Sequence, residues 1–196
     1  MSTSAPGASR TSARLKLLFL ALVCAAPVIG SYLLYYAAPP EGGKKNYGEL
    51  IPQVAIAELA PRPEAPVPAD LAPVAGKWLL VMVDSGDCGD TCAKKLWQIR
   101  QLRLTQGKEM DRIVRVWLVD DDRVPGEALR KEYDGTVILP RSRFPELVQL
   151  PATVTPRDHL YVIDPIGNLM MRFPADPDLN RVKKDLVHLL KVSRIG

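Results

Sequence analysis

Three patterns of hydrophobic and polar residues divide the chain. Residues 17–38, LLFLALVCAAPVIGSYLLYYAA, contain no charged side chain. Residues 39–75 carry eight of the eighteen prolines. From residue 76 to 196, short apolar runs alternate with amphipathic runs, which predicts strands alternating with helices. We therefore expect an apolar helix, a spacer and one folded domain.

The uncharged segment 17–38 is long enough to cross a membrane as a helix. At ~1.5 Å per helical residue it would span roughly 33 Å. A cleaved signal peptide is the alternative, but its apolar region is typically only ~7–15 residues long. Tyr32, Tyr35 and Tyr36 also suit a membrane interface. We expect an uncleaved, single-pass transmembrane anchor.

The charges before this segment predict its orientation. Residues 1–16 contain Arg10, Arg14 and Lys16 and no acidic residue. By the positive-inside rule, this tail is expected in the cytoplasm and everything after residue 38 on the far side. In a bacterium, the anchor would lie in the inner membrane and the domain in the periplasm.

The overall charge gives no support for nucleic acid as a partner. The net charge of +4 includes three charges in the N-terminal tail, which leaves +1 for the rest of the chain. A basic binding face is therefore not predicted.

The proline-rich stretch 39–75 is predicted to be a spacer. Proline disfavours helix and favours extended, semi-rigid chain. Within it, residues 50–59 could add a short strand at the edge of the domain.

The domain 76–196 has the element order of an α/β fold. Apolar patterning predicts strands at 78–83, 113–119, 159–164 and 169–173, and helices at 91–105, 125–133, 145–150 and 178–192. Gly167 and Asn168 suit a tight turn between the last two strands. The order strand–helix–strand–helix, then a hairpin, then a helix, is that of the thioredoxin fold.

Two of the three cysteines carry the candidate chemistry. Cys24 lies in the apolar segment, where a thiol acts as a small apolar side chain. Cys88 and Cys92 lie at the predicted strand-to-helix turn, and residues four apart share one face of a helix. A helix N-terminus favours thiolate, which attacks disulfides and binds soft metals such as Cu(I). A structural disulfide is the alternative, although so short a loop would stabilise little.

The stretch GKWLLVMVDSGDCGDTC (residues 76–92) resembles the start of the Sco/SenC family of membrane-anchored, thioredoxin-like copper proteins, which carry Cys-x-x-x-Cys. The family's proline after the first cysteine is Gly89 here, and its aspartate is matched by Asp90. Residues 117–122 resemble the family's strand and acidic turn, and residues 158–167 resemble its histidine region and hairpin. With the anchor and spacer, the resemblance covers the chain from about residue 15 to the end.

The resemblance implies a copper-binding metallochaperone that acts in assembly of the CuA centre of cytochrome c oxidase, with an oxidase subunit as partner. It implies Cys88, Cys92 and a distal histidine as copper ligands. In the family this histidine lies about nine residues before the hairpin proline, whereas His159 lies six before Pro165. Either His159 is still the third ligand, or the ligand is absent and Pro156 occupies the place beside the cysteines.

The residues leave three functions open. The first is a copper metallochaperone with Cys88, Cys92 and His159 as ligands. The second is a thiol–disulfide oxidoreductase in which Cys88 and Cys92 form the redox pair. The third is a docking factor that has kept the fold without the metal. Whether the protein is an enzyme is left open, and the acidic residues 120–122 are predicted to form a solvated loop rather than a hard-cation site.

Overall fold

The computed structural model describes residues 10–37, 46–56, 69–142 and 150–195. The chain forms two compact units, Met1–Lys45 and Asn46–Gly196.

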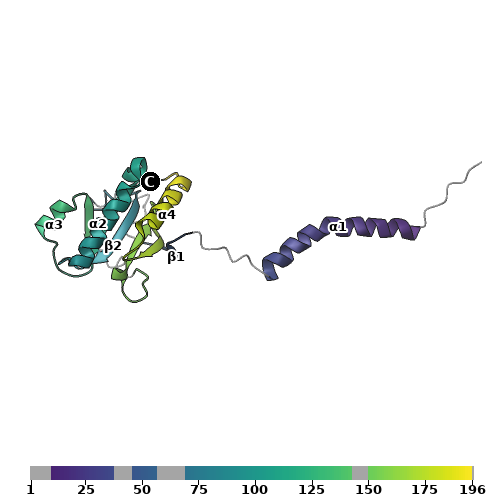
Figure 1. The fold of residues 1–196 in the computed structure, drawn as a ribbon, viewed down its shortest axis with the longest axis horizontal. Coiled ribbons are helices and arrows are strands. Elements are labelled where there is room, and N and C mark those ends of the chain that lie inside the picture. The colour runs from purple at the N-terminus through teal and green to yellow at the C-terminus, as the bar shows by residue number, and fades with distance from the viewer. Residues whose placement is uncertain (1–9, 38–45, 57–68, 143–149, 196) are drawn as a thin grey trace, which may run out of the picture. The chain divides into compact units, whose positions relative to one another are not determined.

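The first unit contains one long helix, α1, at Arg10–Ala37 (Figure 1). An 18-residue stretch within its span Ser12–Ala37 has a mean hydropathy of 2.3, and its apolar side chains are exposed. This confirms an N-terminal helix long and apolar enough to span a membrane. The helix begins before Leu17 because the residues ahead of it, Arg14 to Lys16, are good helix formers.

The second unit is built on a six-stranded mixed sheet in the order β1-β6-β5-β2-β3-β4. The strands are β1 Glu49–Ala55, β2 Trp78–Asp84, β3 Ile113–Val119, β4 Thr136–Pro140, β5 His159–Ile163 and β6 Asn168–Pro174. Strands β2, β3 and β4 are parallel, while β5 is antiparallel to β2, and β6 and β1 continue antiparallel. The ends of β2 and β3 and the start of β5 therefore meet at one edge of the sheet.

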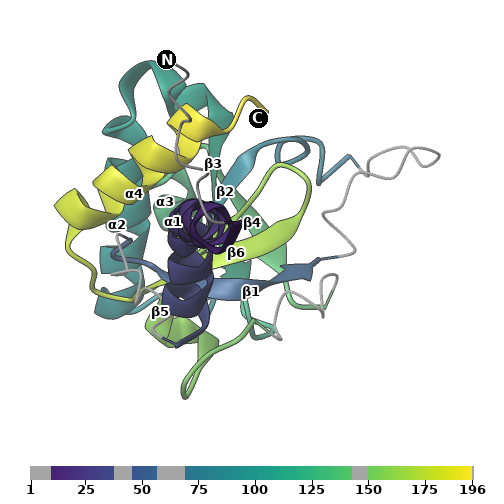
Figure 2. The same ribbon diagram turned by 90° about the vertical axis from the view of Figure 1, so that its right-hand side faces the viewer.

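Two helices, α2 (Asp90–Leu104) and α4 (Leu179–Val192), pack on one face of this sheet (Figures 1 and 2). A short helix, α3 (Glu127–Glu132), lies between β3 and β4 in the chain, and 3-10 turns form at Gly107–Arg112 and Pro156–Asp158. Because side chains alternate along a strand, β2 contributes to two cores. One core contains Leu80 and Met82 with the helices, and the other contains Val81 and Val83 on the opposite face.

The opposite face of the sheet is covered partly by residues that we expected in the spacer. Leu71 and Val74 are 4% exposed and pack there with Ile56. The compact unit therefore includes residues 46–56 and 69–75, so the proline-rich stretch does not lie wholly outside the domain. Proline content shows where helices cannot form, but it does not show which apolar side chains between the prolines are buried.

Strand β4 forms where the pattern gave no element. Residues 136–140, TVILP, pair in parallel with β3, with Trp117 opposite Ile138. The strand is short, so its periodicity is weak. It ends in proline, which suits a strand at the edge of a sheet. Strand β1 lies where a strand was expected at 50–59, and the helix expected at 145–150 falls almost entirely outside the described residues.

The start of the domain is fixed to α4. The amide of Gly48 donates to Oδ2 of Asp185 at 2.8 Å, and the amide of Asp178 donates to the hydroxyl of Tyr47 at 3.2 Å. The guanidinium of Arg181 lies 4.2 Å from the centre of the Tyr47 ring. These contacts hold the first residues of the second unit against the last helix.

We predict that Gly48→Ala destabilises the domain by about 1–3 kcal/mol, the usual cost of overpacking. A Cβ at Gly48 would lie 2.3 Å from the sulfur of Met171 and 2.5 Å from the ring of Phe173, both buried. Chemical unfolding of the detergent-solubilised chain measures the change. Gly126→Ala is the matched control, because a Cβ there has nothing within 4 Å, and an equal loss in both variants would contradict the packing argument.

Candidate functional site

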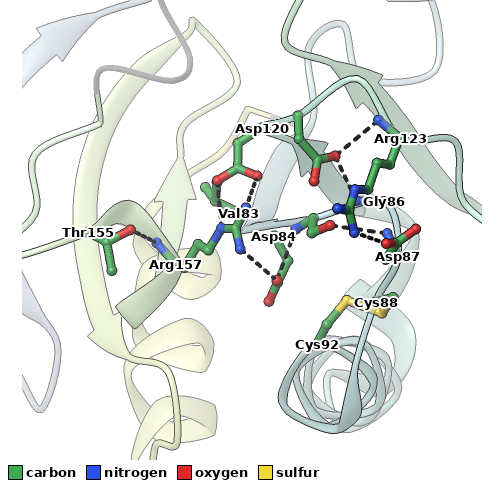
Figure 3. Close-up of polar contacts among 12 residues, drawn as sticks. Val83, Asp84, Gly86, Asp87, Cys88, Cys92, Asp120, Arg123, Thr155 and Arg157 are labelled. Atoms are coloured by element: carbon green, nitrogen blue, oxygen red, sulfur yellow. Dashed lines mark hydrogen bonds and ion pairs between the residues drawn. A yellow bond between two sulfur atoms is a disulfide. The ribbon is translucent and has the colours of Figure 1, made fainter.

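The cysteine pair lies at the turn that joins β2 to α2 (Figure 3). Cys88 and Cys92 form a disulfide with their Cα atoms 5.0 Å apart. Cys92 is 1% exposed and packs in the core beneath the helices, while Cys88 is only partly buried. Cys88 is also the one non-glycine residue in the described part of the chain with a positive φ, +37°. Cys88 is therefore the sulfur that a partner can reach.

The start of α2 favours thiolate at this position. Gly89 is the N-cap and makes no side-chain capping bond, so the first amides of the helix have no capping oxygen. These amides and the helix dipole stabilise a negative charge on a nearby sulfur. Asp90, in the first turn, adds a negative charge that opposes thiolate formation.

A buried ion pair lies one helical turn beyond Cys92. Lys95 is 1% exposed, and its Nζ lies 2.6 Å from Oδ2 of Asp84 at the end of β2. The same Nζ donates to the carbonyls of Val83 (2.7 Å) and Arg157 (2.9 Å). Burial lowers the pKa of Lys95, and the hydrogen bond that it donates to Asp84 opposes that shift. One ammonium group thus ties α2, the end of β2 and the turn before β5 together.

Arg157 continues this charged cluster across the edge of the sheet (Figure 3). Its Nε and Nη2 donate to the two carboxylate oxygens of Asp120, each at 2.7 Å, and its Nη1 lies 3.9 Å from Asp84. The hydrogen bonds to Asp120 raise the pKa of Arg157. This bidentate pair fixes the turn that carries Pro156 and Arg157 against the end of β3.

The loop after β3 also closes over the cysteine turn. The amide of Gly86 donates to Oδ1 of Asp121 at 3.0 Å, and Arg123 forms an ion pair with Asp87. A Cβ at Gly86 would lie 2.1 Å from the carbonyl oxygen of Arg123, so only glycine permits this approach of the two loops. Hydrogen bonds from Ser85 and Gly86 lower the pKa of Asp121. The carboxylates of Asp120 and Asp121 therefore hold loops together.

The structure brings Cys88 and Cys92 together but does not bring His159 to them. His159 is the first residue of β5, and its ring lies 5.9 Å from that of Tyr161. Tyr161 belongs to the core on the face opposite α2, where burial raises its pKa to about 12. Side chains two apart on a strand share a face, so His159 lies on the other side of the sheet from Cys92. Both of its ring nitrogens are buried without a hydrogen-bond partner among the described residues.

In the described part of the chain, Cys88 and Cys92 are the predicted copper ligands that the structure brings together. Within the described ranges, no group of three or more His, Cys, Asp or Glu side chains is placed to hold a metal ion. After reduction, two thiolates fit Cu(I), for which thiolate is a preferred ligand. The third ligand expected at His159 would need a different arrangement of the β5 side chains.

Sequence reasoning did not single out Lys95 and Arg157. For Lys95 a signal exists, because Cys92, Lys95, Leu96 and Ile99 lie at the helical spacing of a buried face. A lysine in such a stripe indicates a buried charge with a partner. Arg157 lies in a turn without periodicity, so only the tertiary structure pairs it with Asp120.

We predict that Asp84→Asn destabilises the fold by about 3 kcal/mol or more, because it leaves the buried ammonium of Lys95 without its carboxylate. Asparagine keeps the size and an oxygen acceptor, so the change tests the charge. Chemical unfolding of the full chain in detergent measures it. Asp176→Asn is the control, because Asp176 pairs with Lys94 on the exposed surface and its loss should matter far less. Equal effects would argue against the buried pair.

Comparison with solved structures confirms the expected resemblance to Sco proteins at the level of the fold. Yeast Sco1 is 15% identical, with a TM-score of 0.50 over 61% of this chain and 83% of that one. Copper-bound ScoI of Bradyrhizobium japonicum is 19% identical, with a TM-score of 0.45 over 62% and 87%. The thioredoxin domain of a thiol-disulfide oxidoreductase from Bacteroides vulgatus is 15% identical, with a TM-score of 0.43 over 72% and 97%.

Comparison by sequence is more specific. A search of curated proteins finds no match. The family model described as a transmembrane-like, thioredoxin-like, C-terminal domain matches residues 78–193, from the first residue of β2 to just past the end of α4. Because the match spans more than half of the chain, the protein belongs to the family of transmembrane-like, thioredoxin-like C-terminal domains.

Proposed function

We propose that this protein is a membrane-tethered thiol–disulfide exchange protein. The observation that carries the proposal is the pairing of an accessible Cys88 with a buried Cys92 at the start of α2. This is the arrangement of an attacking and a resolving cysteine: one sulfur meets the partner, and the other is protected until the first has reacted.

The exchange follows from these positions. In the dithiol form, the Cys88 thiolate attacks one sulfur of a partner disulfide, and the partner's other sulfur leaves as a thiolate. Cys92 then attacks Sγ of Cys88, which releases the second partner sulfur and forms the Cys88–Cys92 disulfide. The partner gains two electrons and the chain loses two, so a dithiol reductant must restore the chain for another cycle.

The helix α1 fits this role, since a tether confines the exchange to one membrane surface. Arg10, Arg14 and Lys16 precede the apolar span and favour a cytoplasmic N-terminus. The domain would then work on the opposite side, which is the periplasm in a bacterium. Disulfides persist in that compartment, so a protein that reduces disulfides has substrates there.

We predict that the Cys92→Ser variant accumulates a mixed disulfide through Cys88, because the resolving thiol is gone. Incubation of the variant with a disulfide-bonded peptide and non-reducing mass spectrometry measure the adduct. Cys88→Ser is the matched control and should form far less adduct, since Cys92 is 1% exposed. More adduct in Cys88→Ser than in Cys92→Ser would reverse the assignment, and none in either would end the proposal.

A copper role is the second candidate, favoured by the Cys-x-x-x-Cys spacing and by the resemblance of residues 76–92 to Sco proteins. In that role the reduced pair carries Cu(I) as cargo, through Cys88 and Cys92. The oxidase subunit that would receive the copper, and the assembly of its CuA centre, are part of this second proposal. His159 is the third ligand in its three-donor form.

We predict that His159→Ala leaves Cu(I) uptake by the reduced full chain unchanged, since His159 lies across the sheet from Cys92. Titration against a Cu(I) chelator measures stoichiometry and affinity. Cys88→Ser should abolish uptake if the pair binds copper. Loss of affinity in His159→Ala by tenfold or more, without loss of folding, would instead support the three-donor site.

A further inference from the structure

The surface around Cys88 is strongly acidic in an otherwise basic chain. Three loops meet there: the cysteine turn, the loop after β3 and the turn before β5. Together with the start of α2 and its first turns, they bring seven carboxylates and four cationic side chains to the site: Asp84, Asp87, Asp90, Asp120, Asp121, Asp122 and Asp158, with Lys94, Lys95, Arg123 and Arg157. The site is therefore net negative by three charges, whereas the whole chain is net positive by four.

Four of these charges, the inner ones, cancel one another: Asp84, Asp120, Lys95 and Arg157. The remaining, outer charges do not cancel. Asp84 and Asp120 are matched by the cations of Lys95 and Arg157. The outer cations, Lys94 and Arg123, already pair with Asp176 and Asp87.

The remaining outer carboxylates face solvent beside the reactive sulfur. Asp90 and Asp122 are exposed, and Asp90 lies two residues from Cys88. Asp121 keeps its negative charge, because its hydrogen bonds lower its pKa. A nucleophilic thiolate gains nothing from such neighbours, so their benefit must lie in the partner that they attract.

We propose that these carboxylates select the partner: the disulfide that this protein reduces lies in a segment rich in Lys or Arg. The inference rests on the proposed exchange function and specifies its substrate class. The acidic surface speeds encounter with a cationic segment and slows encounter with an anionic one. Asp90 and Asp122 are the specificity-determining residues, since neither forms an ion pair with a described residue and Lys94, one turn on from Asp90, pairs with Asp176.

Three small disulfides separate charge preference from exchange itself. Cystamine is dicationic, hydroxyethyl disulfide is uncharged, and glutathione disulfide is anionic. The reduced full chain in neutral detergent is mixed with each, and each rate is divided by the rate of dithiothreitol with the same disulfide, which cancels intrinsic reactivity. We expect a normalised cystamine-to-glutathione ratio of about tenfold at low ionic strength. The ratio should approach one near 1 M salt, where the screening length is about 3 Å.

Charge variants assign the preference to residues. Asp90→Asn and Asp122→Asn should each lower the ratio by about twofold to threefold, and Asp90→Lys should lower it further. The ratio is insensitive to any change in thiol reactivity, because both rates share it. Asp134→Asn is the matched control: Asp134 is exposed at the opposite edge of the sheet, just before β4, and should leave the ratio unchanged.

The outcomes distinguish the two proposals. A chain that does not reduce hydroxyethyl disulfide overturns the exchange function and, with it, this inference. A chain that reduces it but treats cystamine and glutathione disulfide alike overturns the inference alone. A preference that persists in both Asp→Asn variants, or that falls equally in Asp134→Asn, overturns the role of Asp90 and Asp122.

Discussion

The buried ammonium of Lys95 is the contact on which the site depends. It joins three elements that are distant in sequence: its own helix α2, the end of β2 through Asp84 and Val83, and the turn before β5 through the Arg157 carbonyl. A buried charge is tolerated only with such partners, so these elements cannot separate without exposing or stranding it. The cysteine turn lies between two of them. The buried ion pair therefore helps to set the geometry of this turn.

The same charged cluster lies where the turn before β5 approaches the cysteine turn. Arg157, paired with Asp120, lies at this edge of the sheet, while His159 starts the strand with its ring on the far face. Arg157 and His159 are only two residues apart, yet Arg157 lies in the charged cluster and the sheet separates the ring of His159 from the sulfurs. This placement favours chemistry that needs only Cys88 and Cys92, and it makes a two-thiolate carrier more consistent with the fold than a three-donor site.

Exchange and copper transport share one requirement, a reduced pair on a surface that a partner can approach. The helix dipole and the outer carboxylates have opposite charge at that surface. The dipole favours the thiolate, and the carboxylates favour a cationic partner. Because α1 is suited to hold the domain at a membrane, the search for partners is confined to one surface, where charge matching has a large effect on encounter rates. In the proposed exchange, reactivity therefore comes from the cysteine turn, and selection comes from Asp90 and Asp122 beside it.

The sequence by itself determined the features that depend on local pattern. The apolar run of α1, the strand β2, the amphipathic α2 and α4, the β5–β6 hairpin and the position of Cys88 and Cys92 all follow from periodicity and turn residues. The short strand β4 and the burial of Leu71 and Val74 did not, because their partners come from distant segments. Only the tertiary structure decided that Lys95 and Arg157 form the charged support, and that His159 faces away from the sulfurs. A one-residue difference in the pleat reverses which face a side chain occupies, and the register that sets it is fixed by pairing between strands far apart in the chain.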